Sequence, residues 1–212
     1  MSLTIYQLKP RFQALLRPGV ERLAQAGVTA NQVTVFACAV SVFLGLGLFL
    51  LPCPPAAFGL IPLWMLLRMA LNAIDGMLAR EHGQRSTLGA YLNELTDVLS
   101  DAALYLPFAR IAPFDPFWVA VVVLLAALSE MSGLLGEAVG AGRRYDGPMG
   151  KSDRAFVFGA LGLIVACFGQ AGGLPAAWSP VGWVLPVVAA MTAWSIRNRI
   201  QSGVRASHER SH

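Results

Sequence analysis

The sequence predicts an all-α, polytopic membrane protein with six transmembrane helices and an N-terminal interfacial amphipathic helix. Of its 212 residues, 56% are hydrophobic and 13% are charged, and the mean hydropathy is +0.58. A soluble domain carries about 25% charged residues, so this composition indicates a membrane protein. Apolar stretches of about 20 residues recur along the chain, each long enough to cross a hydrocarbon core of about 30 Å. Because lipid offers backbone groups no hydrogen-bond partners, these stretches must be helical.

The N-terminal segment, residues 1–28, differs from the apolar stretches. It alternates apolar and basic residues with helix-like spacing and contains Pro10 and Pro18. It lacks the long apolar core of a signal peptide. We therefore predict an amphipathic segment that lies on the inner leaflet of the membrane, with breaks at the two prolines.

The six predicted spans follow this segment. They lie near residues 31–53, 58–80, 86–110, 117–140, 155–170 and 180–198. The fifth is short and rich in glycine, which makes it the weakest of the six. We expect residues 1–212 to form a single domain, made of the interfacial segment (1–28), a six-helix bundle (31–200) and a polar tail (201–212).

The basic residues set the predicted orientation. Lys and Arg gather before the first span and after the second, fourth and sixth spans. The intervening loops, CPPAA from Cys53, APFD from Ala112 and GQAGGLPAA from Gly169, contain neither. By the positive-inside rule, both termini face the cytoplasm of a bacterial-type inner membrane. The formal net charge of +4 is explained by this orientation and by contact with anionic lipid headgroups, so we expect no nucleic-acid partner.

Four polar side chains interrupt the second and third spans. Asn72 and Asp75 precede a short loop near Gln84, and Asn93 and Asp97 follow it at matched distances along the chain. At 1.5 Å per residue, both pairs lie on the order of 10 Å below the cytoplasmic surface. Because each pair is spaced by three or four residues, it projects from one helix face. An antiparallel hairpin would bring the four into one cytoplasmic pocket, where oxygen ligands suit Mg²⁺, Mn²⁺ or Ca²⁺.

Small residues and an arginine accompany these polar side chains. Asn and Asp within a membrane also pair across helices simply as a structural contact, so the polar groups alone do not distinguish a functional site from such a contact. Glycine inside a helix costs up to about 1 kcal/mol relative to alanine, and Gly76 and Gly89 therefore indicate close approach of a ligand or a helix. Arg80, one turn beyond Gly76, could meet a phosphate. Ionisable groups at this depth by default mark a functional site, and we favour a site.

The same stretch resembles the signature of the CDP-alcohol phosphotransferase (CDP-alcohol phosphatidyltransferase) family, D-x2-D-G-x2-A-R-x8-G-x3-D-x3-D. The spacer lengths are intact, and the matching residues are Asp75, Gly76, Ala79, Arg80, Gly89 and Asp97. Upstream, TANQVT with Asn31 and Thr34 resembles the TPNxxT motif of the family, with Ala30 in place of proline. Six spans with both termini inside agree with the family fold, so the resemblance covers most of the chain.

The resemblance implies a reaction and assigns residues to it. In the family, four carboxylates hold two divalent ions that grip the CDP diphosphate, and the last carboxylate deprotonates the acceptor hydroxyl. For this chain it implies phosphatidyl transfer from CDP-diacylglycerol to an alcohol, with release of CMP, in phospholipid biosynthesis. Asp97 would be the catalytic base, and Mg²⁺ or Mn²⁺ would be held by Asn72, Asp75, Asn93 and Asp97. The CDP-lipid would contact Asn31, Thr34, Gly76, Ala79, Arg80 and Gly89. Family members commonly dimerise, so we expect a homodimer.

Two departures from the signature bear on this expectation. Asn72 and Asn93 stand where the family has its first and third aspartates. An amide still offers a carbonyl oxygen, but two negative charges are missing. Four carboxylates would balance two divalent cations, whereas Asp75 and Asp97 balance one.

Several interpretations of the missing charge stay open. One metal could be held firmly and a second only with substrate, or Glu94 and Asp101 could assist. The chain could also be an inactive family member that scaffolds a lipid-synthesis complex. A divalent-cation transporter is a further alternative, which the apolar outer halves of most spans disfavour. The intact Asp97 favours retained chemistry.

The loop GRRYDGPMGKSDRAF, which begins at Gly142, is the candidate acceptor site. Its four cations are Arg143, Arg144, Lys151 and Arg154. The positive-inside rule would place basic residues there in any case. The many turn residues and the nearby metal pocket suit an anionic group, either the acceptor's phosphate or lipid headgroups. The segment loosely resembles the acceptor region of phosphatidylinositol-phosphate synthases in the family, a likeness too short to name the acceptor.

Glu130 and Glu137 lie seven residues apart in the fourth span and share a helix face. We expect them to pair with Arg110 or Arg68 rather than to line the pocket.

Overall fold

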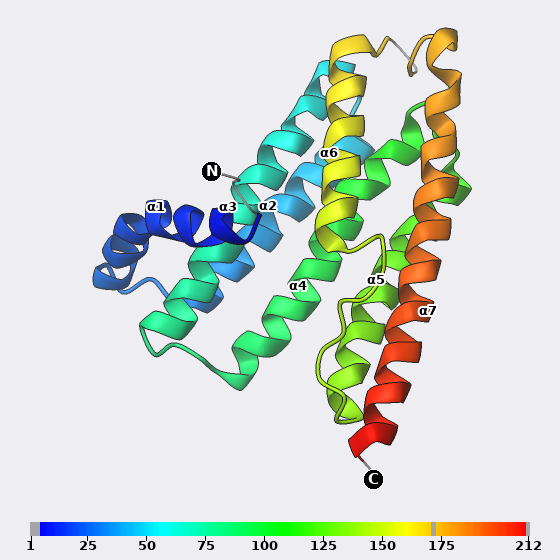
Figure 1. The fold of residues 1–212 in the computed structure, drawn as a ribbon. Coiled ribbons are helices and arrows are strands. Elements are labelled where there is room, and N and C mark those ends of the chain that lie inside the picture. Colours follow the sequence, from blue (N-terminus) through cyan, green and yellow to red (C-terminus); the bar gives the residue numbers. More distant parts are fainter. Residues whose placement is uncertain (1–4, 171–172, 211–212) are drawn as a thin grey trace.

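The computed structural model describes residues 5–170 and 173–210, and it is all-helical (Figure 1). Within these ranges the only β contacts are isolated bridges at Gly173. The α-helices are α1 (Ile5–Gln25), α2 (Ala30–Leu50), α3 (Leu60–Glu81), α4 (Thr87–Tyr105), α5 (Pro116–Ala138), α6 (Lys151–Phe168) and α7 (Val184–Arg210). Three 3-10 segments join them, η1 (Pro55–Gly59), η2 (Leu106–Arg110) and η3 (Ala176–Trp183). The prediction of an all-α membrane protein is confirmed.

Helices α2 to α7 occupy the positions of the six predicted spans. Four stretches are long and apolar enough to cross a membrane: Ala30–Leu50, Pro55–Glu81, Pro116–Ala138 and Ala176–His208. The other two helices, α4 and α6, are shorter and carry three charged residues each. Those charges build the polar interior at one end of the bundle, so length and hydropathy alone do not mark α4 and α6 as spans.

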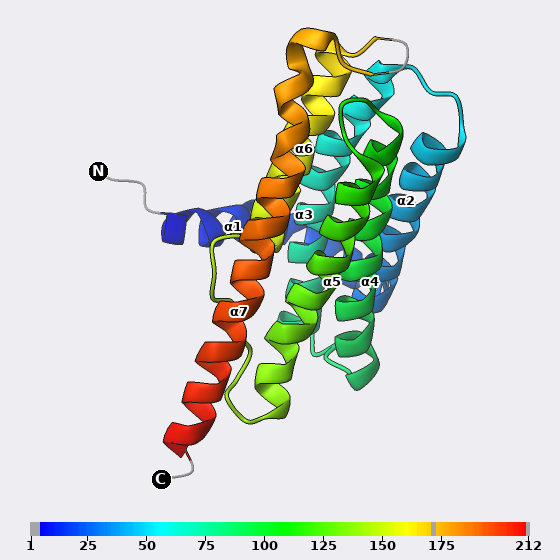
Figure 2. The same cartoon turned by 90° about the vertical axis from the view of Figure 1, so that its right-hand side faces the viewer.

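The predicted breaks in the N-terminal segment were wrong. Helix α1 runs from Ile5 to Gln25 and contains both Pro10 and Pro18. A proline removes one backbone hydrogen bond and can bend a helix without ending it. The helix lies across the direction of the other helices in both Figure 1 and Figure 2. Arg17 ties it to the end of α3 through an ion pair with Glu81, N to O 2.9 Å.

The polar tail predicted for residues 201–212 is helical as far as the structure describes it, because α7 continues to Arg210. Helix α7 packs along α5, and both helices reach the same end of the molecule (Figures 1 and 2). The turns after α1, α3 and α5 also lie towards this end, whereas the connections after α2, α4 and α6 lie at the opposite end. We call them the basic end and the apolar end.

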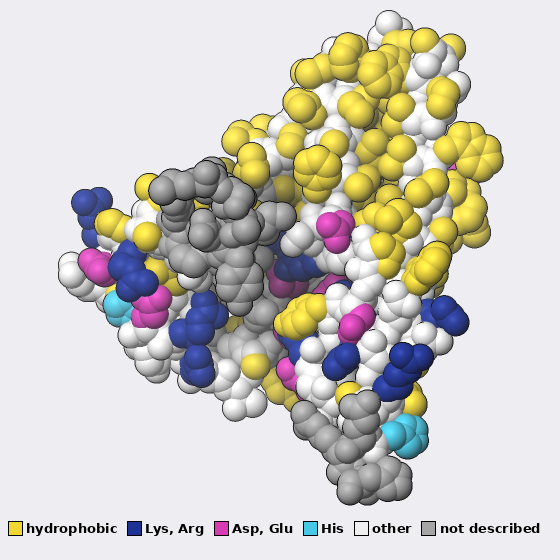
Figure 3. Space-filling view, viewed as in Figure 1, with side chains coloured by type: hydrophobic (Ala, Val, Ile, Leu, Met, Phe, Trp, Pro, Cys, Tyr) yellow, Lys and Arg dark blue, Asp and Glu magenta, His cyan; other side chains and the backbone are white. Residues whose placement is uncertain are grey.

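Side chains differ in kind between the two ends. On the face shown in Figure 3, apolar side chains cover the apolar end, and Lys, Arg, Asp and Glu gather towards the basic end. The main core contains Phe58, Tyr105, Phe108, Phe158 and Leu185, all at most 2% exposed. A second, smaller core joins α1, α2 and α3 around Val20 and Met77. The main core joins α2, α3 and α4 where they approach the apolar end, and the smaller core joins α1, α2 and α3 at the basic end.

Close helix contact also fixes α2 against α4. A Cβ added at Gly45 would overlap the backbone carbonyl of Ala103 on α4. Gly162 of α6 is similarly close to η1, because an added Cβ would lie 3.0 Å from the carbonyl oxygen of Phe58. These small residues therefore serve packing inside this chain, as glycine does in membrane helix interfaces.

Candidate active site

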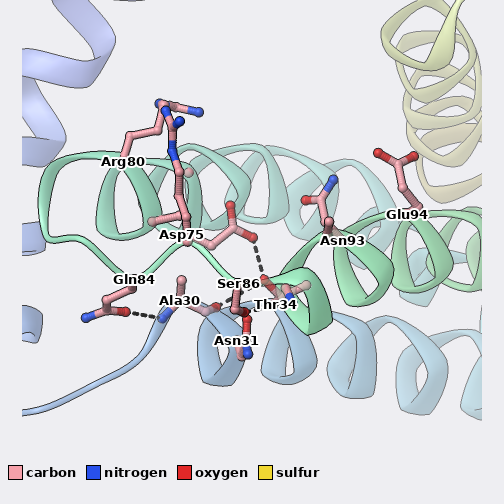
Figure 4. Close-up of a pocket in the computed structure, with 14 residues that line it drawn as sticks. Ala30, Asn31, Thr34, Asp75, Arg80, Gln84, Ser86, Asn93 and Glu94 are labelled. Carbon is pink, nitrogen blue, oxygen red and sulfur yellow. Dashed lines mark hydrogen bonds between the residues drawn. The ribbon is translucent and has the colours of Figure 1, made fainter. Parts of the chain in front are cut away.

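A pocket of about 480 Å³ opens at the basic end, between the start of α2, the end of α3 and the start of α4. It is lined by all six residues predicted to contact the CDP-lipid: Asn31, Thr34, Gly76, Ala79, Arg80 and Gly89. Of the four predicted metal ligands, Asp75 and Asn93 line it as well. Figure 4 shows the Asp75 and Asn93 side chains on facing parts of α3 and α4, above Thr34 of α2. The structure thus brings three helices to one site.

Helix caps hold the three helices in register at the pocket. Thr29 and Gln32 form a capping box at the start of α2, with the Gln32 N–H donating to Thr29 Oγ1 at 3.2 Å. The Ser86 hydroxyl caps α4 by accepting from the Gly89 N–H at 2.9 Å. Gln84, in the α3–α4 turn, accepts from the Ala30 N–H at 2.7 Å. This last bond ties the turn to the N-terminus of α2.

The two signature glycines leave room that a side chain would fill. A Cβ at Gly89 would lie 2.8 Å from Asn31 Oδ1 and 3.0 Å from Ser86 Oγ. A Cβ at Gly76 would lie 3.0 Å from the Arg80 guanidinium. Gly89 therefore lets Asn31 approach α4, and Gly76 lets Arg80 fold back over its own helix at the pocket wall.

Asp75 is the buried acid of the pocket, with 6% of the residue exposed. Its Oδ2 accepts a hydrogen bond from Thr34 Oγ1 at 2.8 Å, and it forms no ion pair with any residue that the structure describes. Thr34 Oγ1 also lies 3.1 Å from the Ala30 carbonyl oxygen inside its own helix, so its single proton is shared between the carboxylate and this carbonyl. A buried carboxylate without a cationic partner is costly, so Asp75 is the natural ligand for a cation in this pocket.

Asn72 and Asp97 are not among the residues that line the pocket, and their side chains are hydrogen-bonded to each other. Asn72 Nδ2 donates to Asp97 Oδ1 at 3.3 Å, and Arg68 Nη2 donates to the same oxygen at 2.9 Å. Lys151, the first residue of α6, forms an ion pair with Asp97 Oδ2. Arg68 also donates to Asp101 Oδ1 at 2.6 Å. Asp97 is therefore held by two fixed cations and one amide.

Arg68 is the residue that the sequence analysis did not connect with the site. It is buried, 5% exposed, and lies one turn before Asn72 on the same face of α3. A charged residue inside the apolar run LWMLLRMALNA needs a partner, and its i, i+4 spacing to Asn72 points to the same hairpin. That spacing could have predicted from the sequence that Arg68 belongs to the site.

The donors of the pocket are one carboxylate and several neutral oxygens. In the part of the chain that the structure describes, no three Asp, Glu, His or Cys side chains lie together as a possible metal site, so an ion here would depend on neutral oxygen donors as well. Asp75, with the oxygens of Thr34 and Asn93 near it, offers one carboxylate and neutral oxygen donors, a set that Mg²⁺ or Mn²⁺ accepts. The two acids suggested as helpers have other partners: Glu94 is paired with Arg143, and Asp101 with Arg68.

The four cations of the candidate acceptor loop do not form one cluster. Arg143 pairs with Glu94, its Nη2 lying 2.9 Å from Oε2, and Arg144 pairs with Asp146 at 3.2 Å. Lys151 contacts Asp97, and Arg154 pairs with Glu130 at 2.9 Å. Hydrogen bonding to the Glu94 carboxylate raises the pKa of Arg143 above its ordinary value, so this loop cation is charged at any physiological pH.

The loop itself is packed against α5 and α7. Its Arg144 N–H donates to the Gly133 carbonyl at 3.1 Å, and its Met149 N–H donates to Ser195 Oγ at 2.9 Å. A Cβ added at Gly136 would overlap the Gly142 carbonyl. Gly147 has a φ of +119°, which favours glycine. These contacts hold the loop in place beside the α3–α4 hairpin.

The expected partners of Glu130 were wrong. It pairs with Arg154 at 2.9 Å, and Arg199 and Arg143 lie 3.8 and 3.9 Å away. Arg68 is bound by the acids of α4, and Arg110 donates to the Phe49 carbonyl at 2.6 Å. The error arose because the pairing depends on how α6 and α7 pack on α5, which sequence spacing within α5 does not report.

The fold and the site together define a helical membrane protein with a polar pocket at one end of its bundle. The family described as CDP-alcohol phosphatidyltransferase matches residues 27–195, and the chain belongs to that family. It is 43% identical over 207 residues to inner membrane protein YnbA of Escherichia coli (strain K12), which covers 98% of this chain and 100% of that protein.

Two solved structures share the fold, both of Mycobacterium tuberculosis phosphatidylinositol phosphate synthase (PgsA1). The complex with manganese and citrate has a TM-score of 0.69 and 21% identity, covering 88% of this chain and 87% of that chain. The structure with CDP-DAG bound has a TM-score of 0.66 and 20% identity, covering 88% of this chain and 92% of that chain. The family resemblance expected from the signature is confirmed.

Proposed function

We propose that this protein transfers a phosphatidyl group from CDP-diacylglycerol to an alcohol acceptor and releases CMP, as an enzyme of phospholipid biosynthesis. The observation that carries the proposal is the pocket, where six residues of the two family motifs meet around Asp75. Family membership supports the reaction class. The related synthase with CDP-DAG bound supports a CDP-linked lipid as donor.

The donor would lie with its CDP moiety in the pocket. Arg80, beside Gly76, supplies a guanidinium that suits the diphosphate oxygens, and Gly89 keeps the wall next to Asn31 free of a side chain. Asp75, with Thr34 and Asn93, would hold Mg²⁺ or Mn²⁺ against the diphosphate. The ion would supply charge stabilisation of the leaving group.

Asp97 would act as general base. The proton of the acceptor hydroxyl passes to its carboxylate, the acceptor oxygen bonds to the phosphorus that carries the lipid, and the bond to the CMP oxygen breaks. A carboxylate offers about four lone-pair sites, of which Arg68, Asn72 and Lys151 occupy three. In the described structure no further contact occupies the fourth, on Oδ2, where the acceptor hydroxyl would bind. Asn72 would position Asp97 in this arrangement.

The acceptor would carry an anionic group and lie beside the loop of Arg143, Arg144, Lys151 and Arg154. Arg154 and Arg199 are buried, and the Nε of each has no hydrogen-bond partner in the described structure. Glu130 is the shared carboxylate of these two guanidinium groups and of Arg143. Arg143 also pairs with Glu94, so the three cations exceed their two acids by one charge, which suits a phosphate on the acceptor.

The membrane arrangement follows from the same proposal. We expect α2 to α7 to form six spans, α1 to lie in the interface, and both termini and the pocket to face the cytoplasm of an inner membrane. The basic residues at one end of the bundle and the name of the Escherichia coli relative support this. A homodimer is the expected assembly, in line with the family.

The test uses purified full-length protein with CDP-diacylglycerol, Mg²⁺ or Mn²⁺ and a panel of alcohols. We expect CMP release that requires both metal and one acceptor, and a lipid product with the mass of the acceptor phosphatidyl ester. Asp97→Ala should abolish it, whereas Glu137→Gln, a change at an exposed acid of α5, should leave it intact. Acceptor-independent CMP release, or none with any acceptor, would contradict the proposal.

One observation favours a second candidate, an inactive scaffold. The contacts of Asp97 with Arg68 and Lys151 would also serve as a purely structural ion-pair network. The scaffold predicts no CMP release from any donor and acceptor, together with loss of stability in Asp97→Ala. A divalent-cation transporter would instead move ions across vesicles without CDP-lipid, so ion flux in proteoliposomes separates it from both.

A further inference from the structure

The Asp97 carboxylate already has two cationic side chains of the protein as partners, Arg68 and Lys151. One carboxylate oxygen, Oδ1, accepts from Arg68 at 2.9 Å and from Asn72 at 3.3 Å, and the other, Oδ2, contacts Lys151. The side chain of Arg68 is 6% exposed and that of Asp97 is 19% exposed. A divalent ion on this carboxylate would have to displace a bonded cation or lie beside two of them. Both outcomes oppose binding.

Asn72 fits this description better than an aspartate would. Its amide donates to Asp97, so the polar contact is attractive without any ion between the two side chains. An aspartate at position 72 would place a second carboxylate against Asp97, and like charges at that distance need a cation to hold them together. The replacement of the first signature aspartate and the presence of Arg68 are therefore two parts of one arrangement.

The charges around Asp97 balance without metal. Asp97 and Asp101 provide two negative charges, and Arg68 and Lys151 provide two positive charges. Asp101 fixes the Arg68 guanidinium from the far side at 2.6 Å, and the Asp97 backbone carbonyl accepts from it at 3.1 Å. Arg68 cannot swing away from this position without leaving Asp101 buried and unpaired.

Asp75 has different surroundings. It is buried in the pocket, hydrogen-bonded to the Thr34 hydroxyl, and forms no ion pair within 4 Å among the described residues, although the charges of Asp97 and Lys151 lie near enough to act on it. We propose that Arg68 and Lys151 take the place of a second divalent cation at Asp97, so that the site binds a single divalent cation, at Asp75. The role of that ion in catalysis rests on the proposed function, whereas its number and place do not.

The test counts ions on the full-length protein in detergent, with Mn²⁺ as the probe and free Mn²⁺ measured by electron paramagnetic resonance. The expected result is one Mn²⁺ per chain. Asp75→Asn should weaken binding by at least about 10-fold, whereas Asp97→Asn and the exposed-acid control Glu137→Gln should each retain one ion. Two ions on the native chain, no ion, or loss of the ion in Asp97→Asn would each overturn the proposal.

A designed gain completes the test. In Arg68→Gln/Asn72→Asp/Lys151→Gln, Asp97 loses both fixed cations and gains a neighbouring carboxylate, so a second Mn²⁺ should bind. A folded variant, judged by its elution profile and helix content, that still binds one ion would contradict the proposal. If the variant does not fold, the comparison of Asp75→Asn with Asp97→Asn decides on its own.

The same preparations separate this inference from the proposed function. CMP release from a protein that binds two Mn²⁺ would contradict the proposal that Arg68 and Lys151 replace a second ion, and it would support the transferase function. One Mn²⁺ at Asp75 without CMP release with any acceptor would support the single-ion proposal and contradict the transferase function.

Discussion

Two aspartates of one signature have different surroundings in this protein. Asp75 is bonded to a hydroxyl, and Asp97 is bonded to an amide and two cations. Because an oxygen ligand must be free of other cations to hold a metal, the two residues are suited to different tasks. Sequence spacing predicted their convergence, but it could not show which partners each would find.

Asn93 should be the position where a restored carboxylate strengthens ion binding. It lines the pocket with Asp75, so Asn93→Asp adds a negative charge beside the proposed ion, where ligand charge tunes affinity. We expect Mn²⁺ affinity to rise by about 10-fold, a change of about 1.4 kcal/mol. Titration of Mn²⁺ measures it, and Asn93→Gln, which keeps the neutral amide, is the control. Equal affinity in both variants would show that Asn93 is not near the ion.

Thr34 should matter through its hydroxyl. Thr34→Val keeps the shape but removes the 2.8 Å hydrogen bond to Asp75, which leaves a buried carboxylate with one donor fewer. We expect the free energy of unfolding without metal to fall by about 1–3 kcal/mol. Thr34→Ser, which keeps the hydroxyl, should lose less. Denaturant titration in detergent gives both values, and a Thr34→Val protein as stable as Thr34→Ser would argue against the bond.

At the scale of elements, the site depends on how closely α2, α3 and α4 approach. The apolar stretches of the sequence predicted the approximate positions of α2 to α7, although α4 and α6 carry too many charged residues to be recognised as spans by hydropathy alone. The apolar pattern missed the start of α6, which begins at Lys151 rather than near 155, since Asp153 caps the helix by accepting from the Gly150 N–H at 2.8 Å. A charged first turn is not detected by a search for apolar residues. In α6 this turn contains Lys151, which contacts Asp97.

Gly45 tests the close packing of α2 on α4. Gly45→Ala would push a methyl group into the Ala103 carbonyl, whereas Gly47 on the same helix has nothing within 4 Å of an added Cβ. We expect Gly45→Ala to lower stability by about 1–3 kcal/mol and Gly47→Ala to leave it equal or slightly higher. The thermal unfolding midpoints in detergent give the comparison. CMP release should fall with Gly45→Ala alone, because α2 and α4 both line the pocket.

At the scale of the whole molecule, the charged side chains are gathered towards one end of the bundle (Figure 3). The α3–α4 turn, the loop between α5 and α6, and the ends of α5 and α7 lie at this basic end (Figure 1), where the residues that line the pocket are also found. The alternation of loops with and without Lys and Arg predicted this grouping from sequence. It could not predict that Arg143, Arg154 and Arg199 meet around Glu130, because that meeting depends on three helices that are distant in sequence.

The orientation of the molecule gives the last prediction. If the basic end faces the cytoplasm, as retention of cationic loops requires, residue 179 in η3 lies outside and residue 82 in the α3–α4 turn lies inside. Both Ser179 and His82 are exposed, so each can be changed to Cys after the three native cysteines, which are free, are replaced. A membrane-impermeant maleimide on intact spheroplasts should label the Ser179→Cys protein only. The His82→Cys protein should react after the membrane is opened. The reverse pattern would put the pocket on the outer side, away from cytoplasmic CDP-linked donors, and would contradict the orientation and the proposed reaction together.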